Sequence, residues 1–218
     1  MRISVLAALF ALPVLAIGGA VAGPGIAPQT PALPGSDNPR IVTAGTYKVD
    51  PAHTLVKWEV DHFGFSDYFG IFGSSTGTLV IDPANLAAAK IDITIPVAKV
   101  TTANEGLTAH LLKPAEAGKK ADFFGANPAD ARFVSTAVAL DDDGDEAKVT
   151  GNLTLNGVTR PVVLDVDFKG AGVNPMNKKT TIGFSAEGKI RRSDFGINFA
   201  LPLVSDEVEL DIAAAFEK

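Results

Sequence analysis

Val149 to Phe168, with the sequence VTGNLTLNGVTRPVVLDVDF, is the stretch that decides the fold of this chain. Apolar side chains recur at every second position on both sides of a central Asn156-Gly157 pair. A period of two places alternate side chains on opposite faces of a β-strand, and Asn-Gly tolerates the positive φ angles of a tight hairpin turn. Pro161 lacks an N–H group, so it fits the beginning of the second strand. The stretch therefore predicts a β-hairpin whose apolar face must be buried against more sheet or against a ligand.

Six further segments show strand character of the same kind, and with the hairpin they give eight predicted strands. The six segments are residues 56–60, 66–82, 91–97, 132–140, 182–190 and 208–216. Strands joined mainly by short turns predict an antiparallel meander, and closing eight strands into a barrel removes the exposed edges. Residues 107–113 have helical spacing instead and end at Pro114. We therefore predict an all-β fold, an eight-stranded antiparallel barrel with one short helical insertion.

The alternation alone does not say which side of the barrel is apolar. Outer-membrane barrels face lipid and carry aromatic girdles at both interfaces, but this chain has one Trp and two Tyr. We therefore predict an apolar interior and no stable membrane insertion after signal cleavage. Strands of ten or more residues would be over about 30 Å long. That length favours an elongated slot, but the composition fits a fully packed core equally well, and both remain open here.

The N-terminal segment, Met1 to Ala22, has the pattern of a secretory signal peptide. Residues 3–17 are almost continuously apolar but short for a membrane span of about 20 residues, and Ala20-Val21-Ala22 is a small-x-small cleavage pattern. Residues 23–45 are rich in proline and glycine, which predicts an extended linker outside the packed core. The barrel domain is expected over residues 46–218, in a protein that is periplasmic or secreted.

The composition excludes several kinds of partner and stabilising bond. The formal net charge is -6, and no basic cluster compensates, which argues against nucleic acid as a partner. There is no cysteine, so neither a disulfide nor a cysteine-linked lipid can form. A domain of about 170 residues buries roughly 70% of its unfolded surface, so its core alone can hold it.

Seven short blocks resemble, in the same order, motifs of the YceI-like family. The blocks are Tyr47-x-x-Asp50-x-x-His53-Thr54, His62-x-Gly64, Phe69-Gly70-x-Phe72, His110-Leu111, Asp122-Phe123-Phe124, Gly151-x-Leu153-Thr-Leu-x-Gly157-Val-Thr-x-Pro161 and Arg192-Ser-Asp194-Phe-Gly196. The resemblance covers residues 46–218. It implies a lipocalin-like barrel and non-covalent binding of a polyisoprenoid or similar long amphiphilic lipid, typically in the periplasm.

The chain also departs from the pattern of that family. Thr54 replaces the usual serine, and Phe69 stands where the family tends to have a basic residue. The family often has an arginine before its His-Leu pair, whereas none precedes His110 in residues 103–109, and residues 112–120 look longer than the usual link. The last two departures fall where the resemblance places the pocket mouth, so no headgroup preference is carried over.

Candidate ligand-binding residues fall into two groups. The first is predicted to line a slot, with ordinary core as the alternative for each: Val56, Trp58, Val60, Ile93, Leu153, Leu155, Val166, Phe184 and Leu210. The second is predicted near the pocket mouth: His110, Phe123, Phe124 and Arg192. Arg192 could instead pair with Asp194 and pin a loop, and the two phenylalanines could bury a loop on the barrel end.

No cofactor or metal is predicted beyond a bound lipid of the polyprenyl or quinone type. His53, His62 and His110 would have to converge from separate segments to bind zinc. A homodimer is left open. Two other functions are kept beside lipid carriage or sequestration. One is a hydrolase or isomerase acting on a lipid in the same barrel, which would need a deep polar cluster such as His62 near a carboxylate. The other is an interaction domain with a solid core.

Overall fold

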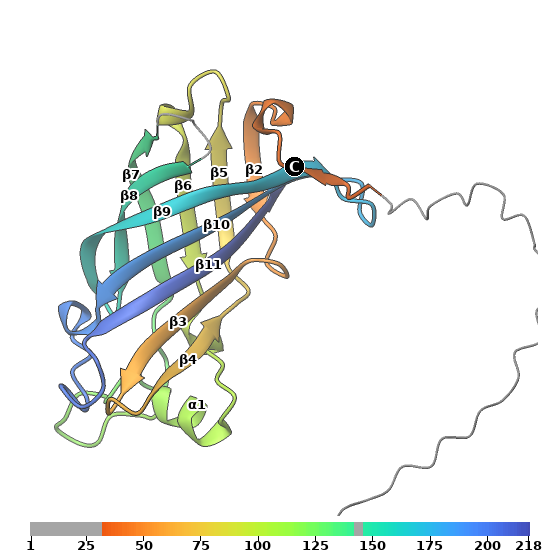
Figure 1. Cartoon of the computed structure of the whole chain (residues 1–218). Helices are drawn as coiled ribbons and strands as arrows, with labels where there is room; N and C mark the ends of the chain where they lie inside the picture. Colours follow the sequence, from red (N-terminus) through yellow and green to blue (C-terminus); the bar gives the residue numbers. More distant parts are fainter. Residues whose placement is uncertain (1–31, 142–145) are drawn as a thin grey trace, which may run out of the picture. The chain divides into compact units, whose positions relative to one another are not determined.

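One antiparallel β-sheet forms most of the part of the chain that the computed structural model describes, residues 32–141 and 146–218 (Figure 1). The predicted signal peptide and the first residues of the predicted linker lie outside these ranges. The strands are β1 (Gly35–Ser36), β2 (Gly45–Val49), β3 (Leu55–His62), β4 (Ser66–Phe72), β5 (Thr76–Ile81), β6 (Lys90–Ile95), β7 (Ala131–Leu140), β8 (Glu146–Leu155), β9 (Val158–Val173), β10 (Thr180–Arg191) and β11 (Glu207–Glu217). The helical segments are α1 (Glu105–Leu111) and the short 3-10 turns η1 (Pro39–Ile41), η2 (Leu86–Ala88), η3 (Val97–Lys99) and η4 (Arg192–Phe195).

Eight of these strands close into a barrel. The order of pairing is β9, β8, β7, β6, β5, β2, β11 and β10, and β10 pairs again with β9. Every pairing in this ring is antiparallel. The predicted eight-stranded antiparallel barrel is therefore confirmed, and α1 is the predicted helical insertion.

One strand of the predicted set is broken, and one strand of the barrel was not predicted. The predicted strand 66–82 is divided into β4 and β5 at residues 73–75, where Ser74 has a φ of 58°. β2, which the sequence analysis did not predict as a strand, is separated from β3 by a turn over Asp50 to His53, in which Pro51 lacks an N–H group for a ladder. As a result β2 pairs with β5 while β3 pairs with β4, and both β2 and β3 pair with β11.

The hairpin that the sequence predicts is β8–β9. Leu155 lies opposite Val158, and Asn156 and Gly157 have φ angles of 52° and 75°, as a tight turn of the I′ type requires. Pro161 lies inside β9, opposite Asn152, but β10 begins to pair with β9 only at Leu164. Pro161 therefore occupies a position where β9 has one paired neighbour, which is where a strand tolerates proline.

Part of the predicted linker, residues 23–45, contacts the barrel, and one of its residues, Val42, lies in the packed core. Gly35–Ser36 forms β1, which pairs with the end of β9. A Cβ atom at Gly172 of β9 would collide with the Pro34 carbonyl oxygen, so glycine permits this close approach. Val42, after η1, is 9% exposed and packs in a core cluster. An apolar side chain beside the barrel end is thus buried despite its proline-rich surroundings.

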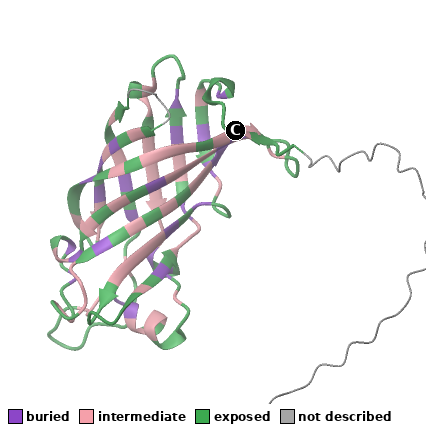
Figure 2. Ribbon diagram, viewed as in Figure 1, coloured by how far each residue is buried: buried purple, intermediate pink, exposed green. Residues whose placement is uncertain are grey.

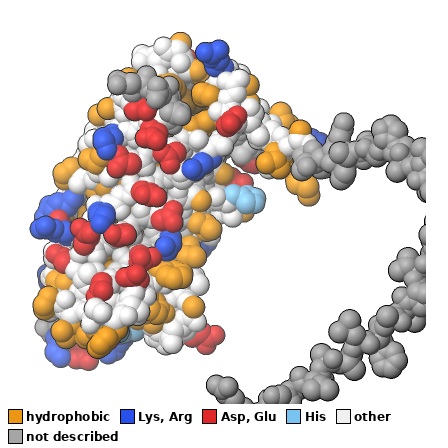
Figure 3. All heavy atoms as spheres, viewed as in Figure 1, with side chains coloured by type: hydrophobic (Ala, Val, Ile, Leu, Met, Phe, Trp, Pro, Cys, Tyr) orange, Lys and Arg blue, Asp and Glu red, His pale blue; other side chains and the backbone are white. Residues whose placement is uncertain are grey.

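Side chains alternate between a buried inner face and an exposed outer face along the strands (Figure 2). Charged side chains are spread over the outer face in Figure 3, and Lys189 of β10 forms ion pairs with Glu207 and Glu209 of β11 at 2.8 and 2.7 Å. The apolar face of the β8–β9 hairpin thus points into the barrel. Within the described residues, no helix has the length and apolar character needed to cross a membrane.

Candidate ligand-binding cavity

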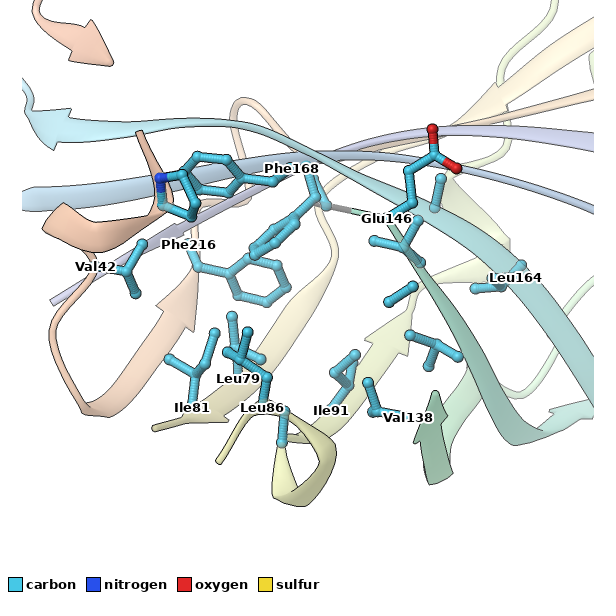
Figure 4. A pocket seen from close by; sticks show the side chains of 18 of the residues that line it. Val42, Leu79, Ile81, Leu86, Ile91, Val138, Glu146, Leu164, Phe168 and Phe216 are labelled. Carbon is cyan, nitrogen blue, oxygen red and sulfur yellow. The ribbon is translucent and has the colours of Figure 1, made fainter. Parts of the chain in front are cut away.

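A cavity of about 360 Å³ lies inside the barrel. Its wall consists of inward-facing side chains of β5 to β11 together with residues of η1 and the β5–β6 connection (Figure 4). Leu79, Ile91 and Phe216 are typical members, and Figure 4 shows them converging on one space. A cavity of this size, with mainly apolar walls, is typical of a site for a small ligand.

Three phenylalanines form an aromatic wall on one side of the cavity. Phe168 of β9, Phe184 of β10 and Phe216 of β11 occupy inner positions on successive strands. The ring centroids of Phe168 and Phe184 are 5.9 Å apart and those of Phe184 and Phe216 6.1 Å, and both contacts are T-shaped. Such edge-to-face pairs are favourable, so they hold the three rings against one another along this wall of the cavity.

Polar side chains are almost absent from the described part of the lining. Among the lining residues within 32–141 and 146–218, only Arg40, Thr54 and Glu146 carry one. The Thr54 hydroxyl donates to the Ala215 carbonyl oxygen (3.2 Å) and accepts from the Ala215 N–H (3.1 Å). Because its hydrogen bonds are made within the protein, Thr54 does not need a ligand partner. The interior therefore suits a purely apolar group, which binds by the area that it buries.

The cavity meets solvent at one end, which we call the cavity mouth. Five lining residues are exposed: Pro39, Arg40, Pro83, Leu140 and Glu146. β5 and β7 run away from α1 (Figure 1), so the C-terminal ends of these strands, beside Pro83 and at Leu140, lie at the barrel end far from α1. Glu146 directs its carboxylate away from the apolar side chains in Figure 4. Arg40 and Glu146 thus place a cation and an anion at the mouth, beside an apolar interior.

The half of the barrel nearer α1 is packed with side chains. The buried cluster there includes Val97, Leu153, Val162 and Phe195, which are at most 8% exposed, and none of these lines the cavity. Phe72 and Phe124 pack against the same cluster. The slot and the solid core that the sequence left open are therefore both present, one in each half of the barrel.

Comparison with known proteins gives the family. Residues 47–216 match the family described as the YceI-like domain. The chain belongs to the YceI-like family. It is similar to Protein YceI of Escherichia coli O157:H7, with 40% identity over 173 residues that cover 78% of this chain and 85% of that protein.

Solved structures with the same fold include members of this family. The YCEI protein of Campylobacter jejuni has a TM-score of 0.57 at 32% identity, covering 72% of this chain and 89% of that one. BcnA of Burkholderia cenocepacia has a TM-score of 0.63 at 26% identity, covering 77% and 98%. A polyisoprenoid binding domain from Saccharophagus degradans has a TM-score of 0.55 at 13% identity, covering 78% and 97%, which is a likeness of fold alone.

Three of the nine residues predicted to line a slot do line the cavity: Ile93, Val166 and Phe184. The other six belong to the packed half or are not part of the lining: Val56, Trp58, Val60, Leu153, Leu155 and Leu210. Their inward orientation follows the predicted alternation, but they lie at another level along the barrel axis. A ligand contact for any of the nine stays a prediction.

The residues predicted at the pocket mouth are not part of the cavity mouth. The family block His110-Leu111 belongs to α1, at the barrel end far from the C-terminal ends of β5 and β7 (Figure 1). The rings of His110 and Phe123 are 5.3 Å apart, and both contact Phe199, while Phe124 contacts Phe72. His110 Nε2 also lies 3.0 Å from Asp122 Oδ2. These residues close the α1 end, which favours the loop-burying interpretation of the two phenylalanines.

Arg192 is a buried structural residue at that same end. Its guanidinium donates hydrogen bonds to the carbonyl oxygens of Ile197, Phe199, Val204 and Ser205 at 2.8–3.2 Å. Burial lowers the pKa of Arg192, and the nearby Asp206 opposes this shift. The prediction that Arg192 pins a loop is right in effect, but its partners are carbonyl groups and not Asp194. It does not line the cavity.

Other histidines are also outside the cavity. His53 is exposed beside Asp50, whose hydrogen bond raises the pKa of His53, and the two side chains are 2.6 Å apart. His62 is exposed at the end of β3, so it does not form the deep polar cluster that a catalytic interpretation would need. Within residues 32–141 and 146–218, no group of three or more potential metal ligands is found.

Several lining residues escaped the sequence analysis. Ile212 and Ala214 share the alternation of Leu210 on β11, so the pattern offered a signal for them. Ala186 likewise shares the alternation of Phe184 on β10. Arg40 and Val42 gave no such signal, because they follow a proline-rich stretch that has no period of two.

Proposed function

We propose that this protein binds the apolar tail of an isoprenoid-like amphiphile non-covalently, and thereby carries or sequesters it. The observation that supports this most is the combination of an apolar interior with charged residues at the mouth. At ~0.8 kcal/mol per buried CH₂, one isoprene unit contributes roughly 3 kcal/mol before ordering costs. A few buried units therefore suffice for micromolar affinity. Arg40 and Glu146 would face a polar headgroup at the solvent boundary.

The similar fold of a polyisoprenoid binding domain supports the choice of ligand class. We further propose that the protein works in the periplasm or as a secreted protein, because Met1 to Ala22 has the pattern of a signal peptide. We propose a binding protein and not an enzyme, since the lining offers no polar group with unused hydrogen bonds deep in the cavity. The homodimer stays a prediction for a measurement of mass in solution.

Native mass spectrometry tests the proposed function directly. Protein purified from its host should show the mass of the chain plus an apolar adduct. Extraction with organic solvent should remove this adduct. The extracted protein should then take up one prenyl alcohol or quinone per chain with micromolar affinity. Repeated recovery of bare protein, together with no uptake of any prenol or quinone, would refute the proposal.

A further inference from the structure

The closed end of the cavity is formed by two large side chains that lie over glycines of neighbouring strands. A Cβ atom at Gly151 of β8 would lie 2.6 Å from Cε2 of Phe133, which comes from β7. A Cβ atom at Gly188 of β10 would likewise lie 2.6 Å from Cδ2 of Leu164, which comes from β9. Both glycines face inward, so Phe133 and Leu164 occupy space that side chains at these positions would otherwise fill. We call Phe133 and Leu164 the cavity floor.

Beyond the floor there is densely packed protein. Phe133 and Leu164 line the cavity and also pack in the cluster that holds Leu153, Val162 and Phe195. These three residues are 1–8% exposed and do not line the cavity. Protein interiors are packed as tightly as organic crystals. A ligand tail that reaches the floor can therefore go no further without displacing buried side chains.

The volume above the floor sets how much tail can enter. A dry cavity of about 150 Å³ binds benzene, which has about six carbons. On that scale the cavity of about 360 Å³ takes roughly 14 carbons, or about three isoprene units. Building on the proposed function, we propose that the cavity selects tail length, and that its floor of Phe133 and Leu164 stops a prenyl tail after about three units. Further units stay at the mouth, beside exposed Pro39 and Leu140.

A series of prenyl alcohols with one to six isoprene units tests this inference on the extracted full chain. Affinities are measured by displacement of a fluorescent apolar probe, at concentrations below those at which the alcohols aggregate. Affinity should rise about tenfold or more with each unit up to about three, because each added unit is buried. From there to six units it should change by less than about threefold.

Variants move the limit in opposite directions. Phe133→Ala removes the ring from the floor and should move the plateau to about four units. Ala186→Phe adds a ring to the wall, where Ala186 lies between Val166 and Ile212, and should move it to about two. Phe69→Ala is the control, because Phe69 is 55% exposed on β4 and does not line the cavity. This variant should leave the plateau at about three isoprene units. Ala186→Phe tests the limit even where Phe133→Ala loses its fold.

Two results would overturn the inference while leaving the proposed function standing. One is an affinity that keeps rising through six units in the unchanged chain. The other is a plateau that neither Ala186→Phe nor a folded Phe133→Ala variant moves. Failure to bind any of the alcohols would instead refute the proposed function, and this inference with it.

Discussion

Ala214→Trp should weaken the binding of a prenyl tail by at least about tenfold. Ala214 faces the cavity from β11, between the strands that carry Phe184 and the buried Val49. An indole ring at this position would fill much of a space of about 360 Å³. It would thus displace the tail and remove the apolar area that the ligand buries. Displacement of a fluorescent apolar probe, measured beside the unchanged chain, gives the affinity.

Ala213→Trp is the matched control for that prediction. Ala213 is the preceding residue of β11 and is exposed on the outer face, so the same indole should leave the affinity within about twofold. Circular dichroism should show the same strand content in both variants. Equal binding by the Ala213 and Ala214 variants would place the ligand somewhere other than the cavity.

Arg192→Met should lower the free energy of unfolding by about 3 kcal/mol or more. Arg192 is 5% exposed, and its guanidinium donates to four carbonyl groups of the segment between η4 and β11. Methionine has similar length but no donor, so buried carbonyls would lose their partners. Leaving a buried acceptor without a donor costs about 1–3 kcal/mol, so several carbonyls that lose their donor together account for a loss of about 3 kcal/mol or more. Urea unfolding followed by the fluorescence of Trp58, the only tryptophan, measures the change.

Arg191→Met provides the comparison for this substitution. Arg191 is adjacent in sequence but exposed at the end of β10, so its loss should change stability by less than about 0.5 kcal/mol. Arg192→Met should also leave the affinity of the remaining folded protein for a prenyl tail nearly unchanged, since Arg192 does not line the cavity. A large loss of affinity with unchanged stability would restore the interpretation of Arg192 as a ligand residue.

The family blocks at the α1 end show what a resemblance can and cannot say about a site. His110, Phe123 and Arg192 lie in blocks that resemble the family, and the sequence analysis places them near the pocket mouth. In the structure His110 and Phe123 pack with Phe199, and Arg192 donates to the Phe199 carbonyl group. Matching blocks identify positions that the fold needs, but not whether they serve packing or a ligand.

Alternation in Val149 to Phe168 was enough to predict the hairpin, and with the other segments the closed barrel and its apolar interior. That information is local, because a period of two fixes the face on which each side chain lies. The level at which each inward side chain lies along the barrel axis is not local. Ile93 meets open space and Leu153 meets packed neighbours, although both follow the same pattern. Only tertiary structure decides between a cavity and a core, because empty volume depends on the side chains of all eight strands together.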